Sequence, residues 1–424
     1  MTEIKHYDDV LVGRKYMPDM EFKFTLSVPN VVTDEFALMV DHDGPRDSQI
    51  NSMVRLADEG KAPYCVVLSV WPGELLLHDG GKRYMRMTSY DLFEREYGDF
   101  VVYELVPYVE EKYGLKISPS PDMHMTSGGS SGGISAFVMA WFHPDYFHRV
   151  YMSSPSFLAM GRGNEIPYLI RKYETKPLRI YEECSENEPH DYFGWSRAVI
   201  EDAREALTFA NYDFKYKFYE GEWHCGRYRD EEEAYHRNEW LWQDWKTPVT
   251  AKGNSPRMDK IIPFHSNWER CEAFPNGEET AKPPESLTKV YDTVVLSNDN
   301  YVWYGANKND DVIHMFATDK AVPEKRHLHA TLHTIPHQKT KGGIDMAVDK
   351  TDRLFVLTEI GIQCVRSFGL IDAILNLPDA SKPLKIAVLD ALYVETESGV
   401  YKRGLQPECV TDSEEKRKQT SYYD

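Results

Sequence analysis

The stretch Met123-His-Met-Thr-Ser-Gly-Gly-Ser-Ser-Gly-Gly-Ile-Ser-Ala-Phe-Val-Met-Ala-Trp141 decides the fold. Its beginning, 123–127, is strand-like, its end, 134–141, is helix-like, and glycines and serines separate the two. The residues from Gly129 to Gly133 fit G-x-S-x-G, a pattern in which a strand turns sharply into a helix and presents a serine hydroxyl at the edge of a sheet. In this frame Ser131 is the nucleophile, and the N–H of Gly132 is one oxyanion donor. A flexible glycine-serine loop is the alternative.

On either side of this turn, the first 245 residues alternate between strand-like and helix-like segments. The strand-like runs are 36–40, 64–70, 150–152, 178–181 and 214–219, and the helix-like segments are 47–59, 91–113, 195–209 and 231–245. Pro107 is expected to kink the longest helix, because proline lacks the N–H that an inner helical turn requires. Alternation at this spacing predicts the α/β class, with a doubly wound parallel sheet covered by helices on both faces.

The composition changes after residue 245. Residues 246–286 hold six prolines without a sustained period and are expected to form a linker. From 287 to 410 the pattern is one of short strands and turns, which predicts a smaller all-β domain. The segment 411–424 is a charged polar tail. The predicted organisation is therefore a catalytic domain over 1–245, a linker, a β domain and a tail.

A serine nucleophile needs a histidine base and a carboxylate that orients it, and in α/β-hydrolases the chain order is serine, acid, histidine. His224 follows the last strand-like run and precedes the last helix, where such a histidine belongs, while His190 and His236 are weaker candidates. The acid should follow the strand at 178–181, where Glu188 is the first choice and Glu186 the second. The alternative is that these glutamates only form part of the solvated surface, as most glutamates in such a charged run do.

Several stretches carry a family resemblance. They are Arg86-Met-Thr-Ser-Tyr-Asp91, Glu104-Leu-Val-Pro-Tyr-Val-Glu110, the glycine-serine segment 128–137 with its continuation to Phe147, and Trp240-Leu-Trp242. With these motifs, residues from about 36 to 245 resemble the "Putative esterase" family of α/β-hydrolases, which includes enterochelin (siderophore) esterases and feruloyl or acetyl-xylan carbohydrate esterases.

The resemblance implies an α/β-hydrolase fold and a serine carboxylic ester hydrolase. Carried over to this sequence, Ser131 is the nucleophile, His224 the base and Glu188 the acid. The turn at Asp43-Gly44 lies where the family supplies its second oxyanion N–H, so Gly44 joins Gly132 in the oxyanion hole.

The substrate contacts follow less directly from the resemblance. Arg86 and Trp223 are candidate contacts, and Arg162 is a further basic residue that could face an anionic substrate. The expected substrate is an acylated carbohydrate or an aromatic acyl ester, and a siderophore ester is the alternative. The chain departs from the family with Ser89 for Glu, Glu188 for Asp, and Tyr228 for a second histidine, which leaves an inactive hydrolase-fold scaffold or binding protein as the rival class.

A second resemblance covers residues from about 287 to 405. Asp349-Lys-Thr-Asp-Arg-Leu-Phe-Val-Leu-Thr-Glu-Ile-Gly-Ile-Gln363 and the strands at 392–394 and 400–403 resemble the end of a gluconolactonase-like (regucalcin-like) propeller. The length allows two to three propeller-like blades, because one blade takes about 40–50 residues. The family's metal ligands are replaced, with Asp292 and Ile344 at two of their positions. We therefore expect no metal and no lactonase activity.

Composition limits the remaining function classes. Lys and Arg number 49 against 68 Asp and Glu, a net charge of −19, which disfavours nucleic acids and anionic membranes as partners. Six scattered cysteines, an N-terminus without a signal peptide and the lack of an 18-residue apolar run predict a cytoplasmic protein with reduced thiols. No cofactor is expected. The expected partner is a small-molecule or carbohydrate ester. The open sheet edges of the β domain are expected either to pack on the catalytic domain or to pair with a second copy of the chain.

Overall fold

The computed structural model describes residues 2–158, 163–275 and 281–411. The chain forms two compact units. The first comprises Met1–Ile170 and Thr175–Gly253, and the second comprises Arg171–Glu174 and Asn254–Asp424. No helix among the described residues is long and apolar enough to cross a membrane.

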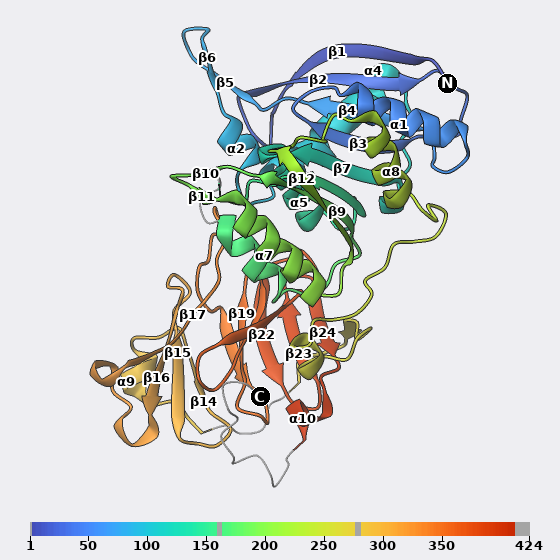
Figure 1. Ribbon diagram of the computed structural model, residues 1–424. Coiled ribbons are helices and arrows are strands. Elements are labelled where there is room, and N and C mark those ends of the chain that lie inside the picture. Colours follow the sequence, from blue (N-terminus) through green and yellow to red (C-terminus); the bar gives the residue numbers. More distant parts are fainter. Residues whose placement is uncertain (1, 159–162, 276–280, 412–424) are drawn as a thin grey trace. The chain divides into compact units, whose positions relative to one another are not determined.

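A ten-stranded mixed sheet forms the centre of the first unit (Figure 1). The strand order is β12-β9-β8-β7-β3-β4-β2-β5-β6, and β1 pairs with β2. The six strands from β12 to β4 are parallel, whereas β2 runs antiparallel to β4. The bounds are β1 Ile4–Val12, β2 Met20–Pro29, β3 Ala37–His42, β4 Cys65–Val70, β5 Glu74–Leu76, β6 Lys82–Tyr84, β7 His124–Gly129, β8 Arg149–Ser153, β9 Arg179–Asn187 and β12 Asp213–Trp223.

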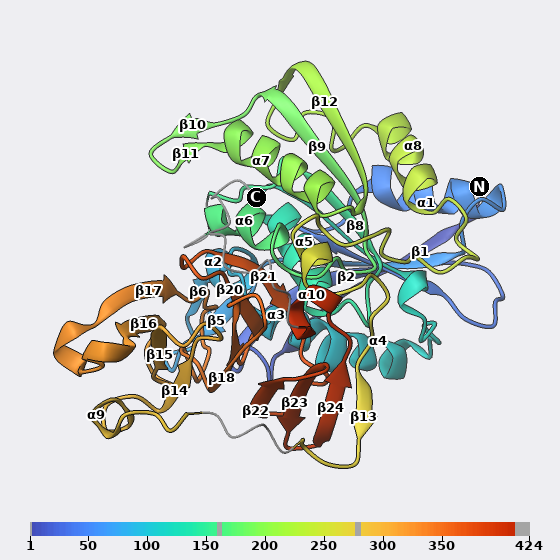
Figure 2. The same cartoon turned by 90° about the horizontal axis from the view of Figure 1, so that it is seen from below.

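Helices cover both faces of this sheet (Figure 2). Helices α1 (Asp47–Asp58) and α8 (Glu231–Leu241) pack together on one face. On the other face lie α5 (Ser131–Phe142), α6 (Ile166–Ile170) and α7 (Ser196–Phe209). The doubly wound α/β arrangement expected from the sequence is confirmed. These parallel strands are rich in apolar residues because helices cover both faces of each strand.

The segment predicted as one long helix over 91–113 is broken into shorter pieces. Helices α2 (Arg86–Tyr90) and α3 (Glu96–Phe100) are followed by a π-helical turn, Val101–Leu105, and then by α4 (Val106–Tyr113). Pro107 lies at the start of α4, so the missing N–H coincides with the widened turn. The predicted distortion therefore takes the form of a π turn at this proline.

The second unit consists of small antiparallel sheets, as the predicted all-β region requires. The first two are consecutive four-stranded sheets, β14-β15-β16-β17 and β18-β19-β20-β21. The third has the order β13-β24-β23-β22, so its edge strand β13 comes from a segment that precedes the first sheet. The bounds are β13 Glu269–Cys271, β14 Thr293–Leu296, β15 Val302–Ala306, β16 Val312–Ala317, β17 His327–Thr331, β18 Asp345–Val348, β19 Leu354–Thr358, β20 Gly361–Val365, β21 Ile371–Leu375, β22 Pro383–Val388, β23 Leu392–Thr396 and β24 Gly399–Arg403.

One strand of each sheet, β14, β18 and β22, connects it to its neighbours. β18 contacts both β14 and β22. Asp345 of β18 accepts hydrogen bonds from the Thr293 hydroxyl (3.3 Å) and from the Ile386 backbone N–H (3.1 Å). One half-buried carboxylate thereby connects all three sheets. Asp345 follows Ile344 directly, the position at which the resemblance implies a replaced metal ligand, and its carboxylate bonds protein groups of two other sheets.

Candidate active site

The turn between β7 and α5 centres on Ser130. β7 ends at Gly129 and α5 begins at Ser131, and between them Ser130 has φ +57° and ψ −125°. A non-glycine residue rarely adopts this conformation, which is characteristic of the serine in a nucleophile elbow. A Cβ at Gly128 would lie 2.1 Å from the carbonyl oxygen of Gly132. The crowding explains why glycines flank the serine.

Ser131 was predicted to occupy the strained turn, but the residue at this turn is Ser130. G-x-S-x-G fits both 128–132 and 129–133, and only the first frame places its serine at the strained residue. Ser131 is the first residue of α5 and is buried. Its hydroxyl hydrogen-bonds Asp91, where burial raises the pKa of the carboxyl to about 6 and this hydrogen bond lowers it in part.

The turn after β8, residues 153–156, connects the elbow to the loops that follow β9 and β12. Ser130 N donates to the carbonyl of Ser153 at 2.9 Å, and the Ser130 and Ser156 hydroxyl oxygens lie 2.8 Å apart. Ser154 Oγ donates to Glu188 Oε1 (2.5 Å) and accepts from the Cys225 N–H (3.0 Å). Sequence reasoning missed this turn. Its signal is the polar run Ser-Ser-Pro-Ser at the carboxyl end of a parallel strand.

His224 and Glu188 form a pair. His224 Nδ1 lies 2.5 Å from Glu188 Oε2, so a proton on Nδ1 leaves Nε2 as the acceptor that a base requires. The Glu188 side chain is fully buried, whereas that of His224 is 28% exposed. Burial lowers the pKa of His224, but hydrogen bonding and charge from Cys225 and Glu188 outweigh it and raise the pKa to about 10.

The alternative acid and the weaker histidines lie elsewhere. Glu186 Oε2 accepts the Gly221 N–H at 2.7 Å and so joins the ends of β9 and β12. His190 stacks against Trp195 in the hairpin of β10 (His190–Asp191) and β11 (Gly194–Trp195). His236 lies exposed on α8 beside Glu239. The structure therefore brings Glu188, and not Glu186, to His224.

The turn predicted to complete the oxyanion hole, residues 43–44 (the oxyanion turn below), follows β3 directly. Asp43 (φ +69°) and Gly44 (φ +85°) adopt consecutive left-handed conformations, and a Cβ at Gly132 would lie 3.0 Å from Asp43 Oδ2. The turn thus packs against the first turn of α5, as the predicted pairing of Gly44 with the elbow requires. With the elbow at Ser130, the N–H that follows the strained residue belongs to Ser131, one position before Gly132.

The candidate substrate contacts differ in their surroundings. Arg86 forms a two-pronged ion pair with the Asp43 carboxylate, which raises the pKa of the guanidinium although burial opposes it. It therefore holds the oxyanion turn in place. Trp223 immediately precedes His224 and is 73% exposed. Arg162 lies outside the described residues, as does the predicted tail from 412 onward.

These features follow from the topology of the sheet. Parallel strands present their carboxyl ends at one edge, and the turns after β3, β7, β8, β9 and β12 meet there. A hydroxyl on a strained turn, an imidazole, a buried carboxylate and backbone N–H groups are together suited to acyl transfer.

Comparison with known proteins identifies relatives of the first unit. Residues 31–246 match the model of the family described as "Putative esterase". No curated protein matches this chain. Among solved structures, a ferulic acid esterase is 16% identical with a TM-score of 0.43, and the match covers 56% of this chain and 98% of that chain.

Two further solved structures are similar to a comparable share of the chain. The enterochelin esterase from Shigella flexneri is 16% identical with a TM-score of 0.44, covering 58% of this chain and 60% of that one. The siderophore hydrolase EstB from Aspergillus nidulans is 16% identical with a TM-score of 0.39, covering 57% and 96%. This chain thus matches about three fifths of the length of the Shigella enzyme.

Proposed function

Because the chain belongs to this esterase family through residues 31–246, we propose that it hydrolyses carboxylic esters with Ser130 as nucleophile, His224 as base and Glu188 as the orienting acid. The observation that carries the proposal is the strained backbone of Ser130 at the turn between β7 and α5. The hydrogen bonds of the 153–156 turn support it, since they join that elbow to the His224–Glu188 pair.

The reaction follows from these positions. Ser130 Oγ attacks the ester carbonyl carbon while His224 Nε2 takes its proton, and the Ser131 and Gly44 N–H groups stabilise the tetrahedral oxyanion. Collapse of this intermediate breaks the ester C–O bond, and His224 returns the proton to the departing alcohol. A water molecule, deprotonated by His224, then attacks the acyl-enzyme and releases the acid and the free Ser130 hydroxyl. The Glu188 carboxylate remains ionised throughout and stabilises the imidazolium.

A fluorophosphonate probe tests the nucleophile. We expect one covalent adduct on Ser130, located by fragmenting the labelled peptide that contains both serines. Ser130→Ala should lower kcat by about 10⁶-fold, as removal of a serine nucleophile does in general. Ser131→Ala is the matched control and should retain most activity. An adduct on Ser131 would instead assign the nucleophile to Ser131, the serine of the motif at 129–133.

The same experiment separates the enzyme from an inactive scaffold. Absence of labelling in folded protein would favour the scaffold, whose partial β domain would then serve assembly.

Within the enzyme class, we propose an acylated carbohydrate or aromatic acyl ester as the substrate in preference to a siderophore ester. Iron-loaded catecholate siderophores are anionic, and Arg86, the basic residue at the oxyanion turn, is already paired with Asp43.

A further inference from the structure

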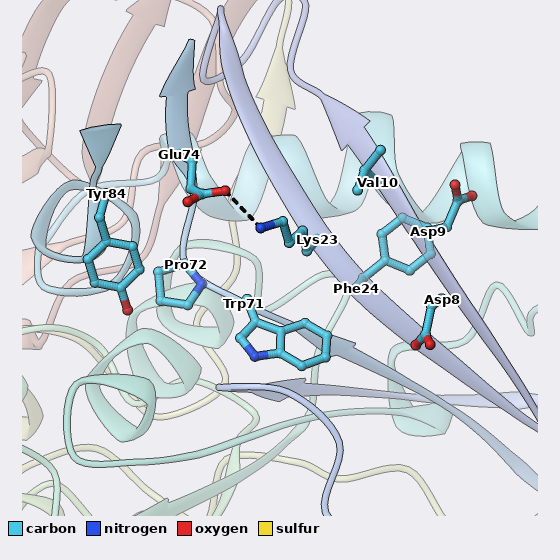
Figure 3. Close-up of a pocket in the computed structure, with 9 residues that line it drawn as sticks. All are labelled: Asp8, Asp9, Val10, Lys23, Phe24, Trp71, Pro72, Glu74 and Tyr84. Carbon is cyan, nitrogen blue, oxygen red and sulfur yellow. Dashed lines mark ion pairs between the residues drawn. The ribbon is translucent and has the colours of Figure 1, made fainter. Parts of the chain in front are cut away.

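A groove in the first unit lies beside the oxyanion turn. Its volume is about 680 Å³, within the range of about 300–1,000 Å³ typical of small-molecule sites. Figure 3 shows its lining: β1 and β2 form one side, and the chain from β4 to β6 forms the other. The lining residues are Asp8, Asp9, Val10, Lys23, Phe24, Trp71, Pro72, Glu74 and Tyr84.

Trp71 connects the groove to the catalytic machinery. It follows β4 directly, and its N–H donates to the carbonyl of Lys23 at 3.0 Å. A Cβ on Gly44 would lie 2.4 Å from Cζ2 of the Trp71 indole, so the ring packs against the backbone of the oxyanion turn. A ligand in the groove that touches Trp71 is therefore next to the turn that receives the ester carbonyl.

The apolar part of the groove presents flat surfaces. Trp71 is 36% exposed and Tyr84 is 60% exposed, and Pro72 lies between them (Figure 3). Exposed aromatic rings next to a cavity provide large, rigid contact surfaces with a polar edge. Such surfaces suit the C–H face of a sugar ring as well as an aromatic ring, so the polar residues must decide between these ligands.

The polar part of the groove is rich in acceptors and negatively charged. Asp8 is exposed, and its Oδ1 accepts from Thr25 (2.6 Å), while no donor within the described chain bonds its Oδ2. Lys23 reaches across to Glu74, with Nζ and Oε2 3.0 Å apart. The third carboxylate of the lining, Asp9, is neutralised by Lys112, whose Nζ lies 2.5 Å from Asp9 Oδ2. Asp8, Glu74 and Lys23 then leave a formal charge of −1. An anionic ligand is disfavoured there, whereas hydroxyl groups can donate to the carboxylates.

We propose that this groove binds a neutral saccharide, with a sugar ring stacked on Trp71 and Tyr84 and its hydroxyls hydrogen-bonded to Asp8 and the Lys23–Glu74 pair. The saccharide is the alcohol part of the ester, which places its acylated hydroxyl at the oxyanion turn beside Trp71. This assignment rests on the proposed esterase activity and extends it by naming the substrate class and the residues that select it.

Binding of ester-free sugar tests the site without any chemistry. Full-length Ser130→Ala protein is titrated calorimetrically with xylohexaose, cellohexaose and, as the anionic comparison, hexagalacturonate. We expect at least one neutral hexasaccharide to bind and hexagalacturonate to bind at least tenfold more weakly. Tyr84→Ala and Asp8→Ala should each weaken binding at least fivefold. Tyr192→Ala is the matched control, because Tyr192 is an exposed aromatic on the β10–β11 hairpin (89% exposed), and it should leave the affinity unchanged.

A kinetic comparison then links the groove to catalysis. A feruloylated pentasaccharide is compared with methyl ferulate, which has the same acyl group and no sugar. Tyr84→Ala should reduce kcat/KM for the sugar ester at least fivefold more than for the methyl ester. If the esterase proposal is wrong, neither ester is hydrolysed, while the titration still measures whether the groove binds the sugar. Absence of neutral-sugar binding, preference for hexagalacturonate, or competition by free ferulate for the groove would each overturn the saccharide assignment.

Discussion

Glu188 divides its two carboxylate oxygens between two tasks. Oε2 faces His224, while Oε1 accepts the hydroxyl of Ser154 and the N–H of Ser185 at 3.1 Å. The carboxylate is thus held from one side while its charge acts on the imidazole from the other. The extra methylene of glutamate, compared with aspartate, is accommodated because the backbone N–H of Ser185, near the end of β9, bonds the carboxylate.

Glu188→Gln preserves this shape and removes the charge. We expect kcat to fall about 10³–10⁴-fold, as loss of the triad carboxylate does in general. Glu188 is one of the groups that raise the pKa of His224, so the acidic limb of the pH profile of kcat/KM should also move down toward 6.5. The control is Glu186→Gln, which changes the neighbouring carboxylate that bonds Gly221. A shift of the limb in the control instead would assign the acid to Glu186.

Two adjacent glutamates on β9 face opposite sides of the sheet and have opposite environments. Glu183 is bonded by the Tyr151 and Tyr219 hydroxyls and by Arg237. Glu182 is fully buried, and within the described chain neither of its oxygens has a hydrogen-bond partner. Burial therefore raises the pKa of Glu182 well above its usual 4.5.

This difference predicts opposite effects of the same substitution. An acid whose pKa is higher in the folded than in the unfolded state stabilises the fold below about pH 4.5, and that stability is lost as pH rises toward the folded-state value. Glu182→Met should thus raise the free energy of unfolding at pH 8 by about 1 kcal/mol or more, and by less at pH 5. Glu183→Met should lower it by about 3–5 kcal/mol, because it leaves Arg237 buried without its partner. Urea denaturation at the two pH values measures both, and destabilisation by Glu182→Met at pH 8 would contradict the reasoning.

Helix α8 of the first unit begins with a side-chain cap. Asp230 Oδ1 accepts the Glu233 N–H at 3.0 Å, and Glu231, Glu232 and Glu233 occupy the first turn, where the helix dipole favours negative charge. Asp230→Ala should cost about 1 kcal/mol, with a range of about 0.5–2 kcal/mol, measured as a lower urea midpoint at unchanged slope. Asp230→Asn keeps the acceptor and should cost clearly less. Equal losses in the two variants would show that charge, rather than capping, is what matters here.

The elements that sequence patterns reveal best are those buried on two faces. The apolar runs of β3, β4 and β8 give a clear signal because each strand lies between two helical layers. β1 gives none: it pairs with β2 alone, and most of its side chains are exposed or half-buried. β1 was missed for this reason. β2 was missed as well, although most of its side chains are buried, and together with β1 it supplies one wall of the groove.

At the scale of the whole molecule, the candidate site depends on contacts between distant segments. His224 and Glu188 could be predicted because each follows a recognisable strand at a fixed place in the fold. Which serine occupies the strained turn could not be predicted, because Gly128-Gly129-Ser130-Ser131-Gly132-Gly133 contains two overlapping G-x-S-x-G motifs that only the backbone conformation distinguishes. The 153–156 turn shows its role only through bonds to Ser130, Glu188 and Cys225.

The second unit closes through strands that are far apart in the sequence. β13 lies before the first sheet yet pairs antiparallel with β24, with Glu269, Arg270 and Cys271 opposite Lys402, Tyr401 and Val400. Sequence patterns could predict short strands here but not this pairing, since three residues carry too little periodicity. The resemblance to a gluconolactonase-like propeller remains a prediction, as does assembly of two copies through this unit.

Val400→Cys tests the closure, because it places a second thiol opposite the free Cys271. Paired antiparallel residues have Cα atoms about 4.5–5.5 Å apart, within reach of a disulfide. The bond would close a loop of about 130 residues, for which chain entropy gives an upper value of about 5 kcal/mol. We expect a disulfide to form on mild oxidation and to raise the Tm of the second unit by about 3 °C or more over the reduced protein. Cys271→Ser with Val400→Cys is the control and should show no redox-dependent shift. Failure of the bond to form in native protein would mean that β13 does not pair with β24 in solution.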